Sequence, residues 1–445
     1  MKLFSKLLSE LYFIFRLPGG LSYIREASRL FMGSRDALLA YQEEKYLRLI
    51  RYAYEHTAYY RRVFDEIGLF KDGELCKDRL NDIPVLTKDT LKNKQDELIS
   101  DEIRKRRPYS AATSGSTGIP LKVWYDQYYK SRNRADKMFM GILNGRDLGQ
   151  SELKMWFRDC DLYQKNGKDK DRFFYFFNNR TFCLASVINE DSLKSYIERI
   201  NTVKPVQIWS TPAPIFEVSK YVINHGIRIH CPCDIILTSS ALYDDMRKTM
   251  EQAFPGTYIV NQYGATEFGV IACSVKDERP MRIFEHSVRV EVMTDDKGIQ
   301  GYGEGDMVVT GLNNYSMPLI RYLTGDMGKI LPFDGSLKGS FKAIETITGR
   351  SLSMLRRRDG SYVSGLFLRD LLTMPWIRTF QLIQHSYEDT EALLVIDGTP
   401  DHHKEELIKI SARLKEALGV ECRFTFCDDI KAEMNGKYFY VKSEI

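Results

Sequence analysis

A loop rich in hydroxyl groups is the first segment whose residue types suit chemistry on phosphate. It reads Thr113, Ser114, Gly115, Ser116, Thr117 and Gly118. The two glycines free the backbone, so its N–H groups and the four hydroxyls can turn towards phosphate oxygens. The loop lacks the Gly-Lys-Ser/Thr ending of a Walker A motif. Taken alone, such a segment is more often an ordinary surface loop, so its interpretation depends on the rest of the chain.

Four more short segments follow this loop in a fixed order. They read Tyr263-Gly264-Ala265-Thr266-Glu267, Arg321-Tyr322-Leu323-Thr324-Gly325-Asp326, Gly349-Arg350 and Asn435-Gly436-Lys437. Their carboxylates suit a hard metal ion or sugar hydroxyls, and their cations suit phosphate charge. Each segment is weak evidence alone, but five segments in this order and at these separations form a strong pattern.

The pattern resembles the adenylate-forming superfamily of acyl-CoA synthetases and related ligases. Within it, the chain is most similar to the phenylacetate–CoA ligase branch, and especially to the CapK-like proteins of bacterial polysaccharide loci. Three further runs carry this likeness along nearly the whole chain: Ile83-Pro84-Val85-Leu86-Thr87-Lys88, Met317-Pro318-Leu319-Ile320-Arg321-Tyr322 and Phe380-Gln381-Leu382-Ile383-Gln384. The resemblance implies a large N-terminal domain, a mobile C-terminal domain and a hinge near Arg350.

The resemblance also implies catalytic roles that agree with elementary chemistry. Activating a carboxylic acid with ATP requires attack on the α-phosphorus and loss of pyrophosphate, so the protein must hold phosphates and neutralise charge. The loop at 113–118 would hold the β- and γ-phosphates. Glu267 would ligate Mg²⁺, with Thr266 near the α-phosphate. Lys437 would place its ammonium between the α-phosphate and the acyl oxygen during adenylation.

The resemblance assigns nucleoside binding to other residues. Asp326 would accept hydrogen bonds from both ribose hydroxyls, and Arg350 would add a charged donor there. Main-chain atoms would frame the adenine around Ser239, Ser240, Ala241, Tyr263 and Gly264.

The expected function is therefore that of an enzyme, an AMP-forming carboxylate ligase that passes an acyl group to a thiol, amine or hydroxyl. Its cofactors are ATP and Mg²⁺, and its substrate is a small carboxylic acid. The acceptor is coenzyme A, a carrier protein or a sugar, and the CapK likeness favours capsular or surface polysaccharide biosynthesis. The alternative is a catalytically inactive nucleotide-binding or scaffold protein of a polysaccharide locus.

Some positions depart from the pattern of the branch. Ser351-Leu352-Ser353 replaces the acidic residues usual after the hinge Gly-Arg, so the hinge role stays unassigned. Glu285 and Glu291 match the branch, but Arg282 stands where a His is usual. The acyl-substrate contacts of this region are therefore unassigned.

Two groups of residues leave alternatives open. Cys231, Cys233, Cys273 and His286 form a zinc site in one hypothesis. Buried free thiols are the favoured alternative, because a single Cys-x-Cys pair is a weak metal signal. The basic turn at residues 356–358 either contacts the phosphates of a pantetheine donor or is a solvated hairpin.

The sequence pattern predicts an α/β protein of two domains, 1–349 and 350–445, whose helices and strands position these groups. Residues 1–105 are expected to be mostly helical, and 109–347 to form a sheet covered by helices, because short apolar runs alternate with helical windows. Strands are expected at 206–209, 235–238, 258–260, 288–292 and 307–310, with helices at 215–223 and 243–254. The C-terminal domain is expected to be a small α+β unit with strands at 380–384 and 392–396 and a helix at 404–418.

Composition limits the class of protein. The 445 residues are 43% hydrophobic, and 64 basic against 60 acidic residues give +4, which excludes disorder and argues against nucleic-acid binding. The absence of a signal peptide or membrane span predicts a cytoplasmic protein. An amphipathic pattern at residues 3–15 predicts a helix that either docks on its own domain or lies on the inner membrane face. A homodimer is also compatible with the sequence.

Overall fold

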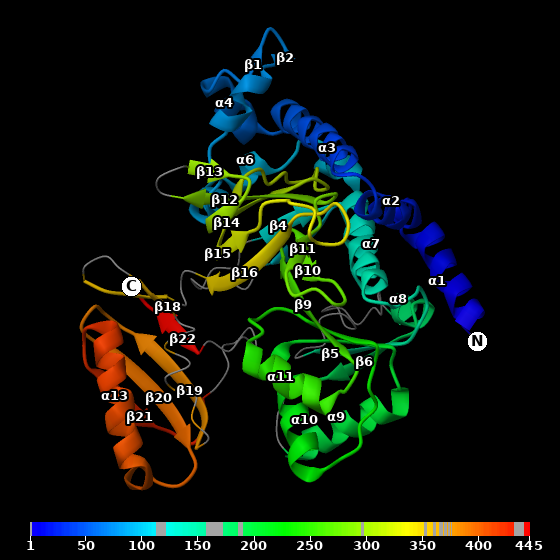
Figure 1. Cartoon of the computed structure of the whole chain (residues 1–445). Coiled ribbons are helices and arrows are strands. Elements are labelled where there is room, and N and C mark those ends of the chain that lie inside the picture. The colour runs from blue at the N-terminus through cyan, green and yellow to red at the C-terminus, as the bar shows by residue number, and fades with distance from the viewer. Residues whose placement is uncertain are drawn as a thin grey trace. The chain divides into compact units, whose positions relative to one another are not determined.

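In the computed structural model, the first 105 residues are mostly helical, as predicted (Figure 1). Thr87 caps the N-terminus of α5, because its Oγ1 accepts a hydrogen bond from the Thr90 N–H at 3.1 Å. A short β1–β2 hairpin interrupts the helices. The elements are α1 (Lys2–Arg16), α2 (Gly20–Met32), α3 (Arg35–His56), α4 (Ala58–Glu66), β1 (Phe70–Lys71), β2 (Glu74–Leu75), η1 (Lys77–Asp82), α5 (Lys88–Asn93), α6 (Gln95–Leu98) and η2 (Ile103–Arg106).

The chain divides into two units. The first comprises residues 1–324 and 328–346, and the second comprises residues 325–327 and 347–445. The structure describes residues 2–112, 122–156, 172–185, 190–294, 298–350, 354–358, 362–364, 368, 372, 374, 376–430 and 440–445.

The described strands of the large sheet begin with a parallel half in the order β6-β5-β7-β8-β9. Its strands are short apolar runs, buried throughout in β7 and β8, as expected of parallel strands covered on both faces. The strands are β5 (Glu152–Trp156), β6 (Arg180–Leu184), β7 (Gln207–Ser210), β8 (Asp234–Leu237) and β9 (Tyr258–Ala265).

Two apolar cores lie on opposite faces of this parallel half. Ile235 and Leu237 share one core with α9 (Glu190–Val203), α10 (Pro212–His225) and α11 (Asp244–Ala253). Ile236 belongs to the other core, with residues of α2, α3 and α7 (Gln127–Leu143). The helix-covered parallel sheet predicted from the sequence is confirmed.

The sheet continues from β9 through antiparallel strands in the order β10-β11-β16-β15-β14-β12-β13. A separate two-stranded hairpin, β3 (Tyr109–Ala112) and β4 (Lys122–Tyr125), precedes α7, and α8 (Arg172–Phe177) precedes β6. The remaining strands are β10 (Gly269–Ser274), β11 (Met281–Ile283), β12 (Val288–Thr294), β13 (Gly298–Gln300), β14 (Gly303–Gly311), β15 (Tyr322–Ile330) and β16 (Ala343–Arg350).

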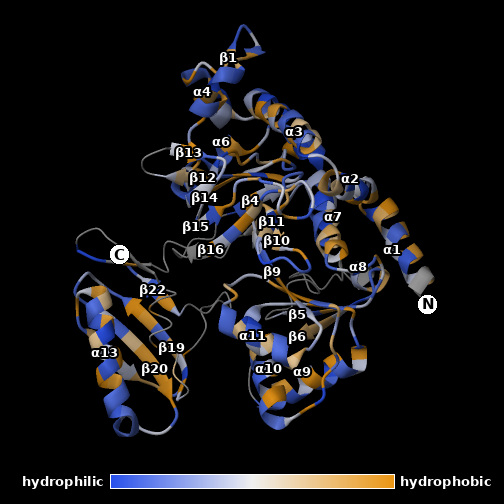
Figure 2. Ribbon diagram, in the orientation of Figure 1, coloured by the Kyte–Doolittle hydropathy of each residue, from blue (hydrophilic) through white to orange (hydrophobic). Residues whose placement is uncertain are grey.

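The second unit is a four-stranded sheet in the order β21-β20-β19-β22, packed against α13. Apolar residues concentrate on β19 and β20 (Figure 2). The predicted helix at 404–418 is confirmed. The elements are β17 (Met354–Arg356), β18 (Tyr362–Ser364), β19 (Ile377–Gln384), β20 (Thr390–Ile396), η4 (Pro400–His403), α13 (Lys404–Leu418), β21 (Cys422–Phe426) and β22 (Val441–Ser443).

No helix among the described residues has the length and apolar character needed to cross a bilayer.

Candidate active site

The segment that carries Glu267 is a β-hairpin at the end of β9. Ala265 pairs with Gly269 across the turn, and the Phe268 N–H donates to the Ala265 carbonyl at 3.2 Å. Gly269 adopts a φ of +76°, which glycine tolerates best. Thr266 is exposed and Glu267 is half-buried, so the two side chains are presented at the tip. The tip offers a carboxylate to a ligand in solution.

Gly264 is required by the packing of this hairpin. A Cβ built at Gly264 would lie 2.4 Å from the Gly269 carbonyl oxygen and 2.6 Å from Gln262 Nε2. Neither approach is possible for real atoms, so a larger residue would force β9 and β10 apart. The glycine therefore serves hairpin closure, whatever part its backbone plays towards a nucleotide.

A buried tyrosine joins this hairpin to the strands that carry the hydroxyl-rich loop. Tyr125 ends β4, where it pairs with Tyr109 of β3, and its hydroxyl donates to the Thr266 carbonyl at 2.6 Å. Burial, followed by the negative charge of Glu267, raises the pKa of Tyr125 well above its ordinary value. The hydroxyl therefore remains a donor at every physiological pH. Sequence reasoning did not identify Tyr125, because its partner lies 141 residues away.

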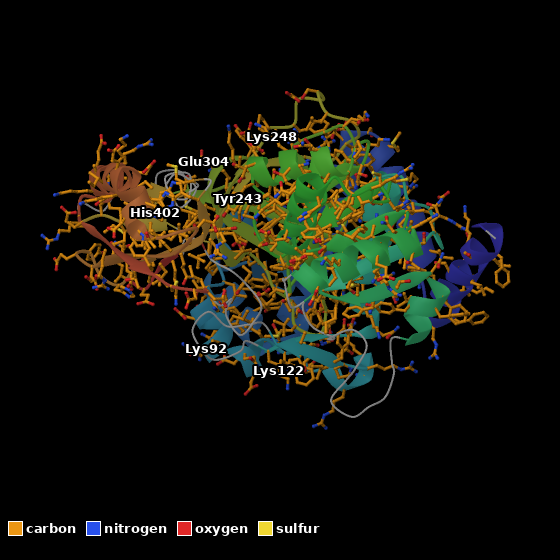
Figure 3. All side chains as sticks on the ribbon, turned by 90° about the horizontal axis from the view of Figure 1, so that it is seen from below. Lys92, Lys122, Tyr243, Lys248, Glu304 and His402 are labelled. Atoms are coloured by element: carbon orange, nitrogen blue, oxygen red, sulfur yellow. The ribbon has the colours of Figure 1, made fainter. Side chains whose placement is uncertain are left out.

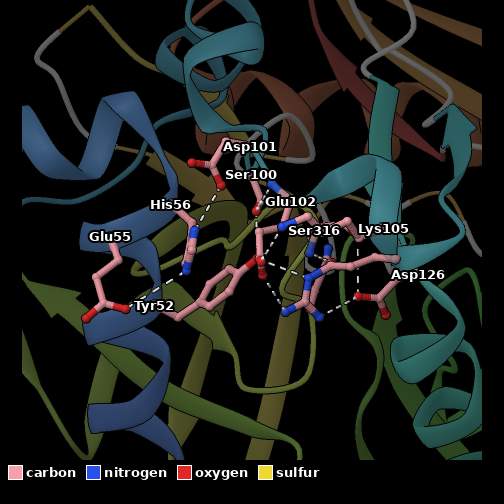
Figure 4. Close-up of polar contacts among 11 residues, drawn as sticks. Tyr52, Glu55, His56, Ser100, Asp101, Glu102, Lys105, Asp126 and Ser316 are labelled. Atoms are coloured by element: carbon pink, nitrogen blue, oxygen red, sulfur yellow. Dashed lines mark hydrogen bonds and ion pairs between the residues drawn. The ribbon is translucent and has the colours of Figure 1, made fainter.

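An ion pair fixes the base of the β3–β4 hairpin. Arg106 at the end of η2 directs Nη1 to Asp126 Oδ2 at 3.3 Å, and Asp126 directly follows β4. Buried Asp126 also caps α7, since its Oδ1 accepts from the Tyr129 N–H at 2.7 Å. Tyr52 of α3 accepts from Arg106 Nε at 3.0 Å (Figure 4). Both strands beside the loop are thus attached to the helical core.

The loop itself, residues 113–118, lies outside the described residues. Its flanks are Ala112 and Lys122, which pair across β3 and β4. Lys122 is exposed, and its ammonium lies 4.3 Å from the centroid of the Trp124 ring (Figure 3). A cation thus stands beside the segment predicted to hold phosphates.

Residues 239–241, the predicted adenine-binding segment, follow the carboxyl end of β8. Ligands of open α/β sheets bind beyond this edge. Ser239 has a φ of +73°, an uncommon conformation for a residue other than glycine. Ser239, Ser240 and Ala241 are all exposed. Unusual backbone and exposure at this edge support a binding role, which remains a prediction.

The segment at residues 321–326 contacts β9, the first strand of the Glu267 hairpin, through Thr324. The Tyr263 hydroxyl lies 3.4 Å from Thr324 Oγ1, which donates to the Met307 carbonyl at 3.1 Å. Asp326 is half-buried in β15 and belongs to residues 325–327, which group with the second unit. Arg350 ends β16, and Lys437 lies outside the described residues. The roles predicted for these three residues remain predictions.

Arg321, in the same segment, has a structural role. It is buried at φ +51°, and Nη1 donates to the carbonyls of Asn81 and Ile83 at 2.9 and 2.8 Å. The Leu86 N–H donates to the Arg321 carbonyl at 2.9 Å. Two of the sequence runs that carry the family resemblance therefore lie side by side.

The acidic residues that match the ligase branch are engaged in ion pairs. Arg35 donates to both carboxylate oxygens of Glu285, and Glu291 lies 3.4 Å from Arg321 Nη2. Arg282, in place of the usual His, is buried and donates to the Lys338 and Gly339 carbonyls. These contacts stabilise the fold around a cavity of about 430 Å³ that both glutamates line. None of them indicates an acyl-binding role.

The zinc hypothesis is wrong. All four candidate ligands are among the described residues. No three His, Cys, Asp or Glu side chains in the described part of the chain are grouped so that they could hold a metal ion. Cys231 packs against the core of α9–α11, whereas Cys273 is buried in the core on the opposite face of the sheet. His286 Nε2 lies 2.8 Å from Asp136 Oδ1 instead. Cys231, Cys233 and Cys273 are free thiols, but the predicted burial holds only for Cys273, because Cys231 is half-buried and Cys233 is exposed.

The basic turn after β17 has partners within its own unit. Arg357 donates through Nε to the Ala417 carbonyl at 2.7 Å, and Arg358 pairs with Glu388. These contacts favour a structural hairpin over the proposed contact with a pantetheine donor.

Comparison with known proteins agrees with this geometry. Residues 355–444 match the family model of the CapK C-terminal domain. The chain is 24% identical to protein CapK of Staphylococcus aureus, over 91% of this chain and 88% of that protein. It is 25% identical to phenylacetate-coenzyme A ligase of Aromatoleum evansii, over 76% of this chain and 74% of that protein. The chain is similar in sequence to CapK and to the phenylacetate-coenzyme A ligases. The resemblance predicted from its motifs is confirmed.

Solved structures show the fold that these relatives imply. A 2-hydroxyisobutyryl-CoA ligase in the postadenylation state aligns with a TM-score of 0.71 at 15% identity, covering 94% of this chain and 92% of that chain. ATP-bound MatB from Rhodopseudomonas palustris aligns with a TM-score of 0.51 at 17% identity, covering 75% and 66%. The α/β fold of the adenylate-forming enzymes is therefore confirmed.

Proposed function

We propose that this chain is an AMP-forming ligase that activates a small carboxylic acid as an acyl-adenylate and transfers the acyl group to an acceptor. In the first step a carboxylate oxygen bonds to the α-phosphorus of ATP and pyrophosphate leaves. In the second step the acceptor attacks the acyl carbon and AMP leaves. The relatives named as coenzyme A ligases and the adenylate-forming fold support this proposal.

The observation that carries it is the hydrogen bond from Tyr125 to the Thr266 carbonyl. It attaches the hairpin with Glu267 to the strands from which the 113–118 loop emerges. A reaction at the α-phosphorus would need the phosphate-holding loop and the Mg²⁺ ligand close together, because the ion would neutralise the charge of the phosphates.

The residues present suit Mg²⁺–ATP. Glu267 offers a hard oxygen ligand at an accessible tip, and the ion would neutralise charge on the phosphates. In the proposal, the backbone N–H groups and hydroxyls of 113–118 hold the β- and γ-phosphates. Thr266 lies near the α-phosphate, and Lys437 neutralises charge there and on the acyl oxygen.

Asp326, Arg350 and residues 239–241 complete the proposal on the nucleoside side. Asp326 accepts hydrogen bonds from the ribose hydroxyls, with Arg350 as a donor beside it. The exposed backbone of residues 239–241 borders the adenine, together with Tyr263 and Gly264.

We infer coenzyme A as the acceptor to test first, because several relatives are named as coenzyme A ligases. A carrier-protein thiol or a sugar amine or hydroxyl is the alternative acceptor. The likeness to CapK supports work on capsular or surface polysaccharide.

Pyrophosphate release with a panel of aryl, hydroxy and sugar acids tests the proposal. We expect release that depends on one class of acid and on Mg²⁺. Glu267→Gln should raise the Mg²⁺ concentration for half-maximal rate while leaving AMP binding nearly unchanged. Glu251→Gln, on the exposed face of α11, is the matched control and should behave like the wild type.

Lys437→Ala should abolish adenylation but leave transfer from a supplied acyl-adenylate largely intact. Lys248→Ala, on an exposed part of α11, is its control (Figure 3). No release with any acid, in a protein that still binds ATP, would support the inactive-scaffold alternative.

A further inference from the structure

Helix α1 exposes a stripe of large apolar side chains. The stripe consists of Phe4, Leu7, Leu11, Ile14 and Phe15, which are 64%, 52%, 36%, 56% and 75% exposed. Spacings of three and four residues place them on one face of the helix. Phe176 of α8, the helix that contacts α1, is also 69% exposed. Side chains of this size rarely stay in water as a group on a soluble protein without a binding partner.

The opposite face of α1 is already packed against its own unit. Ser9 Oγ donates to Asn178 Oδ1 at 2.7 Å, and Phe13 and Leu17 are buried in a core with α2 and α7. Gln127 Nε2 also donates to the Arg16 carbonyl at 3.0 Å. The helix is therefore docked by one face, and the apolar stripe remains on the other. The predicted docking of this helix on its own domain is confirmed, and the membrane-surface alternative concerns the exposed face.

The segment that carries the stripe has a net positive charge. Residues 1–34 contain five basic and two acidic side chains, a net charge of +3, against +4 for the whole chain. Lys6, Arg25 and Arg29 are exposed, whereas Glu26 is half-buried and accepts a hydrogen bond from the Tyr41 hydroxyl at 2.8 Å. An exposed apolar helix face in a segment with net positive charge is typical of helices that lie in the headgroup region of anionic membranes.

We propose that the exposed face of α1 docks on the surface of a bilayer that contains anionic lipid. The apolar stripe enters the headgroup–acyl boundary, and the net positive charge of residues 1–34 attracts the segment to anionic lipid. None of the residues proposed for adenylation belongs to α1 or α8. Resting on the proposed function, this contact would place a ligase for surface polysaccharide at the membrane.

A second copy of the chain is a weaker occupant for this surface. The five side chains expose on the order of 500 Å² of apolar surface, given full side-chain areas of about 150–250 Å². A stable dimer interface buries about 800 Å² from each partner, of which somewhat more than half is apolar, so area alone does not exclude a dimer. Charge does disfavour it, because two copies of a segment with a net charge of +3 would repel each other in a two-fold contact, whereas anionic lipid would neutralise that charge.

Vesicle flotation with the full-length protein tests the proposal. The vesicles contain phosphatidylcholine alone or phosphatidylcholine and phosphatidylglycerol in equal parts. We expect binding to the anionic vesicles that weakens as salt rises, and little binding to the neutral vesicles. Leu7→Asn/Ile14→Asn should lower the partition coefficient at least about tenfold, because two apolar side chains leave the boundary. Lys6→Gln/Arg25→Gln should lower it only for anionic vesicles.

The matched control is Ile408→Asn, since Ile408 is 61% exposed on α13 and lies far along the chain from the stripe. It should bind vesicles like the wild type. Unchanged thermal unfolding would show that Leu7→Asn/Ile14→Asn still folds, and unchanged pyrophosphate release would separate this proposal from the proposed function. Absence of binding to anionic vesicles would overturn the proposal. So would an α1 variant that binds vesicles normally but converts a lipid-free dimer to a monomer.

Discussion

Replacing Tyr125 with Phe removes one hydroxyl and its hydrogen bond to the Thr266 carbonyl, while the ring and its stacking on Tyr129 stay in place. A hydrogen bond of this kind contributes about 1 kcal/mol net. About 1.4 kcal/mol corresponds to a factor of ten in an equilibrium constant. The equilibrium constant that favours the hydrogen-bonded position of the Glu267 hairpin should therefore fall roughly fivefold. If that position serves metal binding, the loss should appear as a higher Mg²⁺ requirement and a slower adenylation step.

The assay is pyrophosphate exchange over a range of Mg²⁺ concentrations, with unfolding followed in parallel. Tyr129→Phe is the matched control. Tyr129 is equally buried and stacked at 4.5 Å on Tyr125, yet its hydroxyl has no hydrogen-bond partner within the described part of the chain. Tyr129→Phe should therefore leave the Mg²⁺ dependence unchanged. If both variants behave alike, or if Tyr125→Phe matches the wild type, the hydrogen bond from Tyr125 to Thr266 has no role in positioning Glu267.

Three further predictions concern the framework. Gly264→Ala should abolish adenylation and lower the free energy of unfolding by about 1–3 kcal/mol, measured by urea titration, because its Cβ would strike the Gly269 carbonyl. Arg321→Met should lower the free energy of unfolding by about 1–3 kcal/mol in the same titration, because the Asn81 and Ile83 carbonyls lose a charged donor while Glu291 keeps Arg289, and a loss below about 0.5 kcal/mol would contradict the structural role. Burial lowers the pKa of Lys45 from 10.5 to about 7, so the unfolded state binds more protons between these values and this group makes stability rise with pH there. Lys45→Met should flatten that part of the pH profile of unfolding, and an unchanged profile would show that Lys45 keeps its proton in the fold.

The parallel half of the sheet was predictable because each strand is a short apolar run followed by a helical pattern. Val206 to Trp209 and Ile235 to Thr238 lie within one residue of β7 and β8. The prediction for β9 ended at Val260, whereas the strand continues to Ala265. Those last residues are not an apolar run. They form a strand because they pair with β10, which the local pattern of β9 does not reveal.

The site was predictable as a set of motifs but not as a geometry. Thr266 and Glu267 stand out by their order relative to the other motifs, while Tyr125 is one of 26 tyrosines and has no local signal. Arg321 lies inside a nucleotide motif, yet its contacts are with the Ile83 segment and Glu291. Spacing along the chain does not distinguish a residue that binds a ligand from one that supports its neighbours.

The zinc hypothesis failed for a related reason. Cys231 and Cys273 lie on separate elements, and only the strand order shows that they belong to opposite faces of one sheet. His286 was also assigned by type alone, whereas its partner Asp136 comes from α7. Residues that are distant in the sequence can be assigned to one metal site only when the topology shows that they lie together.

The central claim is that a carboxylate oxygen of the substrate attacks the α-phosphorus of ATP. The most direct measurement uses the acid that gives the fastest pyrophosphate release, labelled with ¹⁸O in both carboxylate oxygens, with ATP, Mg²⁺ and the acceptor. Mass spectrometry of the nucleotide product should find AMP that carries one ¹⁸O atom, because the bridging oxygen of the acyl-adenylate leaves with AMP. Unlabelled AMP, or ADP as the product, would contradict the account.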